Sequence, residues 1–289
     1  MDPENFLEET DVIPLVLALN KFAIDVNAPD TRQDVLTSAG IDPSFLSNLK
    51  FSIPANRFSQ SLVAAFHRHQ VSKGQLGYHP MVSFLRYLVG LSSIYSFSDQ
   101  DIALFNRLIE QSYEKFKILT CRNAVGRIES PQGTGIGTGL LVSNNLFLTC
   151  HHIFTKAQLK QAWVRFGYMA GGSMMKDVFE LELGPISHSR QLDYALTQLK
   201  GFPRIQPVIP VPSQLNSGEK IRAIHYPFGG ECVISKPGTV LQVGEGYIDH
   251  TVWTENGSSG APLFDKNWDV IAIHQGQPGI SRKVTQKAL

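Results

Sequence analysis

The apolar residues of this 289-residue chain change their spacing near Cys121. Before that point they recur every three or four residues, which is the spacing of one face of an α-helix. After it, short apolar runs such as GLLVS, LFLT and VIAIH are separated by Gly, Pro, Asn and Ser, which is typical of antiparallel strands joined by turns. The pattern predicts an all-helical N-terminal part and an all-β C-terminal part, either a barrel or a sandwich.

Capping residues place the predicted helices of the first part. Asp11 is predicted to cap the first helix. Asp30 is predicted to cap a second helix, which Gly40 would end. Ser98 and Asp101 form a capping-box pattern before a long helix. Two further helices are predicted around residues 58–66 and 81–88.

Charge and composition narrow the function classes. The formal net charge is +1 and no Lys/Arg-rich block occurs, so neither nucleic acid nor an anionic membrane is expected as a partner. The first residues lack a signal-peptide pattern, and no apolar run approaches the roughly 20 residues of a membrane span. The three cysteines are odd in number and far apart, so we expect free thiols and a cytoplasmic location.

The most informative segment of the β part is GSSGAP, from Gly257 to Pro262. It resembles the G-x-S-G-G-P element of chymotrypsin-fold serine proteases, and this resemblance implies a double β-barrel with Ser259 as the nucleophile. A serine hydroxyl needs a neighbouring base and backbone N–H groups aimed at the oxyanion. The resemblance assigns that oxyanion hole to the N–H groups of Gly257 and Ser259.

Two further segments resemble the other catalytic elements of that family. LTCHHIF is similar to the strand-end L-T-A-A-H-C element, in which the fourth residue counted from the threonine is the base; counting from Thr149 gives His152. QLDYALTQL is similar to the D-x-A-L element, which makes Asp193 the acid. The chain order His152, Asp193, Ser259 is the chymotrypsin order. These three residues are therefore the predicted triad of a serine endopeptidase.

Two motifs invite a metal or cofactor interpretation. Cys150, His151 and His152 are all metal-ligand types, but they lack C-x-x-C or H-x-x-x-H spacing, and adjacent side chains on a strand point to opposite faces. The glycine-rich run over 132–142 is followed by a strand and a turn, whereas a dinucleotide site needs a helix there. Residues 137–141 instead resemble the G-T-G strand that precedes the histidine strand in the protease family. We therefore expect neither a metal nor a cofactor.

The residues around the nucleophile suggest a branch of the family. Digestive proteases have an aspartate before the nucleophile that captures a freed N-terminus, whereas this chain has Ser258, so activation by that route is not expected. The chain resembles bacterial glutamyl endopeptidases, which implies that Thr254 and His274 bind an acidic P1 side chain by donating hydrogen bonds. Alternatively, both residues line a pocket of another preference. Position 253 holds a tryptophan, Trp253, rather than an acidic residue. This disfavours Arg or Lys at P1.

The helical part resembles effector-associated and bacterial death-like domains through Arg32, Leu36, Ala39 and Gly40. This resemblance implies recruitment by a protein partner, such as an NTPase sensor or scaffold, in a prokaryotic conflict or antiphage system. The substrate would be a protein, for example a latent pore-forming effector. A DNA-binding helix-turn-helix and an inert pro-domain are the alternatives for this part.

The expected division of the chain is a helical interaction domain over 1–95, a connecting helix over 96–118 and a protease domain over 119–289. A catalytically inactive protease-like adaptor is the competing function for the whole chain.

Overall fold

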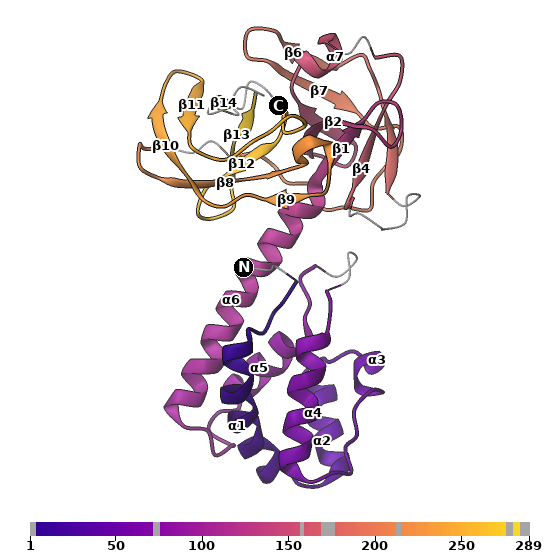
Figure 1. The fold of residues 1–289 in the computed structure, drawn as a ribbon. Helices are drawn as coiled ribbons and strands as arrows, with labels where there is room; N and C mark the ends of the chain where they lie inside the picture. The colour runs from indigo at the N-terminus through magenta and orange to yellow at the C-terminus, as the bar shows by residue number, and fades with distance from the viewer. Residues whose placement is uncertain are drawn as a thin grey trace. The chain divides into compact units, whose positions relative to one another are not determined.

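The computed structural model describes residues 4–71, 76–156, 159–168, 177–211, 215–275 and 280–283. The chain forms two compact units, Met1–Leu119 and Thr120–Leu289. The first unit is helical and the second is built from two β-sheets (Figure 1). The predicted fold class, an all-α domain followed by a chymotrypsin-like double β-barrel, is confirmed.

The helices of the first unit mostly follow the predicted pattern. Those within its described residues are α1 (Glu9–Asp25), α2 (Pro29–Ser38), α3 (Pro43–Leu46), α4 (Ala55–Arg68), α5 (Pro80–Gly90) and the greater part of α6 (Asp99–Ala124).

Two predicted helix caps are wrong. The first helix begins at Glu9, and Asp11 lies inside it, where its carboxylate binds Arg107 of α6 at 2.8 Å. The second helix begins at Pro29 rather than after Asp30, because a proline with fixed φ is favourable in the first turn. Gly40 follows the end of α2 with φ of 72°, the left-handed conformation expected of a terminating glycine.

The capping box before α6 is confirmed. The N–H of Ser98 donates to Asp101 Oδ2 at 2.7 Å, and the N–H of Asp101 donates to Ser98 Oγ at 3.3 Å. The helix is longer than predicted, because it continues through Cys121 to Ala124. Both of these residues are buried, so the helical burial pattern persists where the sequence suggested that strands begin.

Arg32, one of the residues that suggested the domain type, is a structural centre of the first unit. It is only 2% exposed, and its guanidinium donates to the carbonyls of Ala23 and Val26 at the end of α1. It also donates to the carbonyls of Phe51 and Ile53 before α4. A single buried cation therefore satisfies carbonyls that a helix end leaves without partners.

None of the described helices has by itself the length and apolar composition of a membrane span. Helices α1 and α2 meet that test only when taken together, as a pair bent by 118°.

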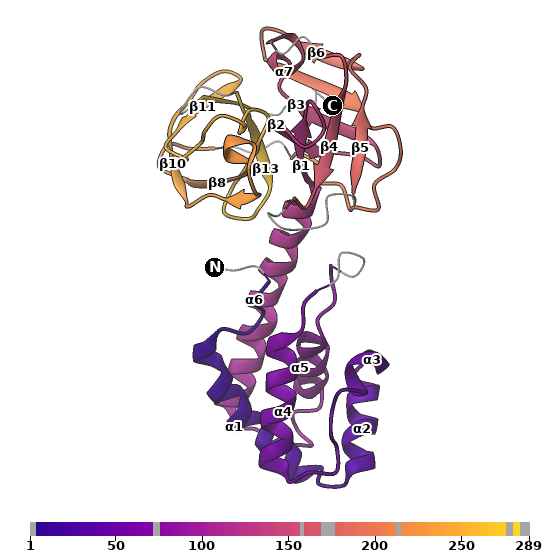
Figure 2. The same cartoon turned by 45° about the vertical axis from the view of Figure 1, so that its right-hand side comes forward.

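The second unit contains two seven-stranded antiparallel sheets, which lie side by side in Figure 2. The first has the order β5-β4-β1-β2-β3-β7-β6 and the second the order β10-β11-β14-β13-β12-β8-β9. A pairing of β10 with β8 closes strands of the second sheet into a barrel. In the first sheet, a bridge between Leu181 and Leu199 joins the β5 strand to the end of β7.

The strands of the first sheet are β1 (Val125–Glu129), β2 (Gly135–Leu141), β3 (Leu146–Thr149), β4 (Ala162–Phe166), β5 (Val178–Leu181), β6 (Ser187–Ser189) and β7 (Tyr194–Gln198). Those of the second are β8 (Lys220–His225), β9 (Val233–Ile234), β10 (Gly238–Val243), β11 (Tyr247–His250), β12 (Pro262–Phe264), β13 (Val270–His274) and β14 (Ile280–Lys283). The unit also contains α7 (His152–Lys156) and a 3₁₀ turn, η1 (Pro227–Gly229).

A buried ionic cluster joins β1 and β4 in the first sheet. The carboxylate of Glu129 is fully buried and accepts hydrogen bonds from Arg165 Nε at 2.6 Å, from Arg127 Nη1 at 3.1 Å and from the N–H of Gly133 at 2.7 Å. Both arginine side chains are at most 5% exposed. The single negative charge of this carboxylate is therefore shared between two arginines that have left water.

Candidate active site

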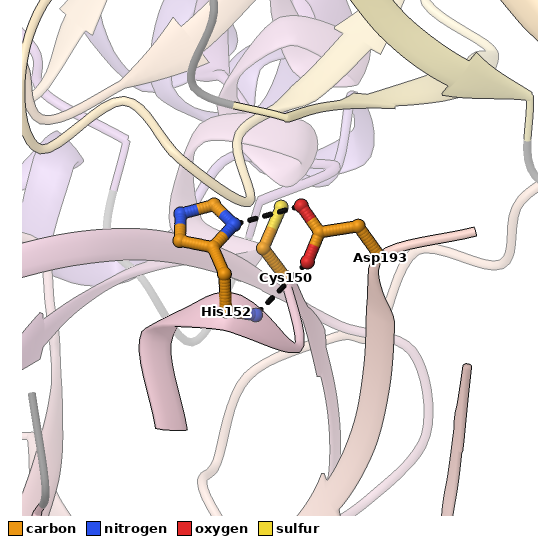
Figure 3. Close-up of side chains that lie close together, drawn as sticks. All are labelled: Cys150, His152 and Asp193. Carbon is orange, nitrogen blue, oxygen red and sulfur yellow. Dashed lines mark hydrogen bonds and ion pairs between the residues drawn. The ribbon is translucent and has the colours of Figure 1, made fainter. Parts of the chain in front are cut away.

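His152 and Asp193 form a hydrogen-bonded pair at the ends of two neighbouring strands of the first sheet, β3 and β7. His152 Nδ1 donates to Asp193 Oδ2 at 2.7 Å, and the backbone N–H of His152 donates to Asp193 Oδ1 at 2.9 Å (Figure 3). The side chains are 20% and 17% exposed, so both are accessible. The carboxylate fixes both the orientation of the imidazole and the position of its proton, since Nδ1 must carry it.

Strand pairing brings these two residues together although they are 41 positions apart. Strand β3 ends at Thr149, which pairs with Ala195 at the start of β7. The predicted base, His152, therefore follows one strand end, and the predicted acid, Asp193, precedes the neighbouring strand. Asp193 has φ of 49°, and its carbonyl accepts from the N–H of His151 at 3.3 Å. This bond anchors the turn to the segment that carries His152.

The structure separates the roles of the two adjacent histidines. The ring of His151 is 8% exposed and stacks on His188 of β6, with centroids 5.0 Å apart. Burial, followed by the nearby charge of His188, lowers the pKa of His151. His151 therefore packs against β6, while His152 binds the Asp193 carboxylate.

Cys150 is the third member of a cluster with His152 and Asp193, and the ligand atoms of all three lie within 4.8 Å of one another (Figure 3). These atom types suit zinc. However, nitrogen and oxygen ligands of a tetrahedral zinc ion stand about 3.3 Å apart, whereas His152 Nδ1 and Asp193 Oδ2 are 2.7 Å apart. The Cys150 thiol also donates to the carbonyl of His274 at 3.1 Å. The spacing is that of a hydrogen bond, and the thiol secures the end of β13.

Thr138 of β2 binds the loop of residues 257–260, which contains Ser259 and is called the serine loop below. Its N–H donates to the carbonyl of Ser259 at 2.9 Å, and its hydroxyl donates to the carbonyl of Gly257 at 2.8 Å. Its own carbonyl accepts from the hydroxyl of Thr149, the last residue of β3. Thr138 thus links the serine loop of the second sheet to the strand end that leads to His152. Among the described contacts, the side chains of Ser259 and His152 share no hydrogen bond.

Along the serine loop, backbone N–H groups that donate hydrogen bonds within the fold alternate with groups that do not. Those of Ser258 and Gly260 donate to the carbonyls of Glu255 and His274, at 2.9 and 2.8 Å. Those of Gly257 and Ser259 have no acceptor among the described residues. Gly257 and Gly260 have φ of 91° and 85°, so glycine permits both turns of the loop.

Thr254 and His274 are the residues predicted to bind the P1 side chain. The described interactions include no hydrogen bond between them. His274, at the end of β13, is 1% exposed, and its backbone pairs with Gly260 and Ala261, the two residues that follow the serine. Its Nδ1 lies 3.4 Å from Ser281 Oγ, which lies 2.8 Å from Nε2 of the buried His250. Thr254 is half-buried. His250 and Ser281 had no recognisable spacing in the sequence, so only the folded chain reveals this relay.

Family models match both the helical part and the β part of the chain. Residues 137–273 match the family model of the trypsin-like peptidase domain, and residues 9–111 match that of effector-associated domain 8. Among solved structures, the chain resembles Deg5 at 18% identity and a TM-score of 0.49, covering 60% of this chain and 90% of that one. It resembles the Rv3671c protease from M. tuberculosis, in its active form, at 18% identity and a TM-score of 0.48, covering 60% and 80%.

The chain therefore carries a trypsin-like peptidase domain behind an N-terminal effector-associated domain. It is a serine endopeptidase, which acts on protein substrates. Both predicted resemblances, of the β part and of the helical part, are confirmed at this level.

Proposed function

We propose that His152, Asp193 and Ser259 form the catalytic triad of this endopeptidase. The observation that carries the proposal is the 2.7 Å hydrogen bond that fixes the proton of the imidazole on Nδ1. The other nitrogen, Nε2, is then unprotonated and can take the proton of Ser259 as its Oγ attacks the scissile carbonyl. The same nitrogen returns that proton to the leaving amine, and Asp193 stabilises the transient imidazolium.

The oxyanion of the tetrahedral intermediate is bound by Gly257 and Ser259. Their N–H groups are the two in the loop without an acceptor among the described residues, whereas Ser258 and Gly260 are engaged. Two backbone donors that need no reorganisation stabilise a developing negative charge strongly, and removing one such donor costs about 100- to 1,000-fold in rate.

Labelling with a fluorophosphonate probe tests the triad. Such a probe reacts only with an activated serine, so the full-length chain should label and the Ser259→Ala variant should not. The matched control is Ser217→Ala, because Ser217 is exposed and far from Ser259 in the sequence. This variant should label as fully as the parent. Labelling of Ser259→Ala at the parent rate would refute the assignment.

We propose that the pocket prefers an acidic P1 side chain. His274 is buried beside the serine loop and backed by the His250–Ser281 relay, which holds its ring in one orientation. Thr254 supplies a hydroxyl on the approach to the same loop. Peptides that differ only in Glu, Asp, Leu or Arg at P1 test this; the highest kcat/KM is expected for Glu or Asp, and a preference for Leu would contradict it.

The effector-associated domain supports a role in prokaryotic conflict systems. We propose that this domain binds a protein partner, such as an NTPase sensor or scaffold, and brings the protease to its substrate in the cytoplasm during antiphage defence. A latent pore-forming protein activated by cleavage is the proposed target. In cells challenged with phage, protection should be lost in the Ser259→Ala variant. Retained protection would instead favour a non-catalytic adaptor.

A further inference from the structure

Ser258, which precedes the proposed nucleophile, is fully buried and hydrogen-bonded on two sides. Its hydroxyl accepts from the N–H of Glu255 at 3.0 Å and shares a 2.7 Å hydrogen bond with Nδ1 of His225. Either neutral tautomer of the imidazole supports this second bond, since both a hydroxyl and an unprotonated ring nitrogen can accept. Ser258 therefore has a defined partner within the fold at the position where the digestive enzymes have an aspartate.

His225 is well suited to hold that position. It ends β8, where it pairs with Val233 of β9, so its backbone belongs to the sheet. Its side chain is fully buried, and the ring of Trp253 lies edge-on to it at 5.5 Å. Burial lowers the pKa of His225 to about 4, so the ring is neutral at physiological pH. Its Nε2 has no hydrogen-bond partner among the described residues, so the bond to Ser258 is the ring's anchoring contact there.

The turn that follows His225 holds the other end of the same loop. The N–H of Phe228 donates to the carbonyl of Asn256 at 2.5 Å. Because a trans peptide points its C=O and N–H in opposite directions, this bond directs the N–H of Gly257 away from Phe228. The backbones touch here: a Cβ on Gly257 would lie 2.6 Å from both Gly229 N and Tyr226 O.

We propose that His225 is a positioning residue which, through Ser258, keeps residues 255–259 in the conformation that forms the oxyanion hole. We call these residues the oxyanion loop. The proposal rests on the proposed role of Ser259. The oxyanion loop is thereby ordered from within the folded domain and needs no charged N-terminus released by cleavage.

Variants of the full-length chain test this. His225→Ala removes the anchor, whereas His225→Asn keeps a group that can donate or accept near the position of Nδ1. We expect His225→Ala to lower kcat by about 10- to 100-fold with little change in KM, because misplaced donors weaken only transition-state binding. His225→Asn should recover most of kcat. Ser258→Ala should lower kcat at least as much as His225→Ala, because it also removes the acceptor of the Glu255 N–H. The double variant should lose no more than Ser258→Ala alone, since that variant already lacks the contact with His225.

Hydrogen–deuterium exchange measures positioning without depending on activity. His225→Ala and Ser258→Ala should accelerate exchange in the peptide that spans the oxyanion loop. Exchange in β4 and β5 should stay unchanged, and His225→Asn should resemble the parent. If the folded His225→Ala chain keeps parent exchange in the loop, the proposal is wrong. If the parent neither labels nor cleaves, the proposed function fails, and the exchange result still decides the role of His225.

Discussion

Replacing Glu129 by glutamine should destabilise the protease unit severely. Burial alone would raise the pKa of this carboxyl, but hydrogen bonds from Arg165 and from the N–H of Gly133 outweigh burial and lower its pKa. The carboxylate is therefore ionised at neutral pH. In Glu129→Gln, one oxygen remains as an acceptor and an NH₂ group faces donors. Arg127 and Arg165 both lose the negative charge of Glu129.

The expected magnitude follows from these contacts. Removing one partner of a buried ion pair costs about 3–5 kcal/mol, because the remaining charge is left uncompensated. Since glutamine retains one acceptor, we expect about 3 kcal/mol. For a domain of this size, the melting temperature falls roughly 2–4 °C per kcal/mol, so the unit should melt about 6–12 °C lower.

Thermal unfolding of the full-length chain at pH 7 measures the effect. Glu180→Gln is the matched control, because Glu180 binds Lys200 at a similar 2.6 Å but their side chains are 37% and 48% exposed. Exposed pairs contribute little to stability, because water and salt screen their charges. Since the folded-state pKa of Glu129 is lowered, its contribution is present at neutral pH and is lost as the pH falls through that pKa. The parent and Glu129→Gln should therefore converge in acid. Equal, small shifts for Glu129→Gln and Glu180→Gln at pH 7 would refute the reasoning.

Three further outcomes are expected. Asp193→Asn should lower kcat about 10,000-fold with KM nearly unchanged in peptide hydrolysis, because an amide NH₂ facing Nδ1 moves the imidazole proton to Nε2; a loss under tenfold would contradict this role. Gly260→Ala should melt lower than Gly218→Ala, because both have positive φ but a Cβ on Gly260 would lie 2.1 Å from Thr138 O, whereas at Gly218 nothing lies within 4 Å. Burial lowers the pKa of His250 to about 4, so the free energy of unfolding should fall as the pH drops from 6.5 toward 4. At pH 5 the loss due to this histidine is about 2 kcal/mol, and urea titrations should show a smaller pH dependence in His250→Gln.

The architecture was predictable because burial imposes a period on the sequence. The face of α5 that carries Phe84 and Leu88 is fully buried, as its spacing indicated. The predicted cap at Asp11 failed for a tertiary reason, since its carboxylate binds Arg107, 96 residues away. Helix α3 has four residues, which is too short for any period to show.

The candidate site was predictable only where its residues lie in short motifs. His152, Asp193 and Ser259 each belong to a segment with local constraints. His225 does not, because its role depends on Ser258, 33 positions further along the chain. Thr138 lay in a recognised strand, but its hydrogen bonds to the serine loop depend on how the two sheets pack, and no local spacing encodes that packing.

The contacts of Thr138 show that the proposed site is built from residues of both sheets. The first sheet carries the proposed acid and base, and the second carries the serine, whose loop carbonyls are bound by a β2 residue. A chain cut in the connection between β7 and β8 would therefore yield two halves with no activity of their own, and activity would return only on reassociation. The same dependence means that a substitution at Thr138 of β2 would alter the turnover rate, although Thr138 is not one of the three proposed triad residues.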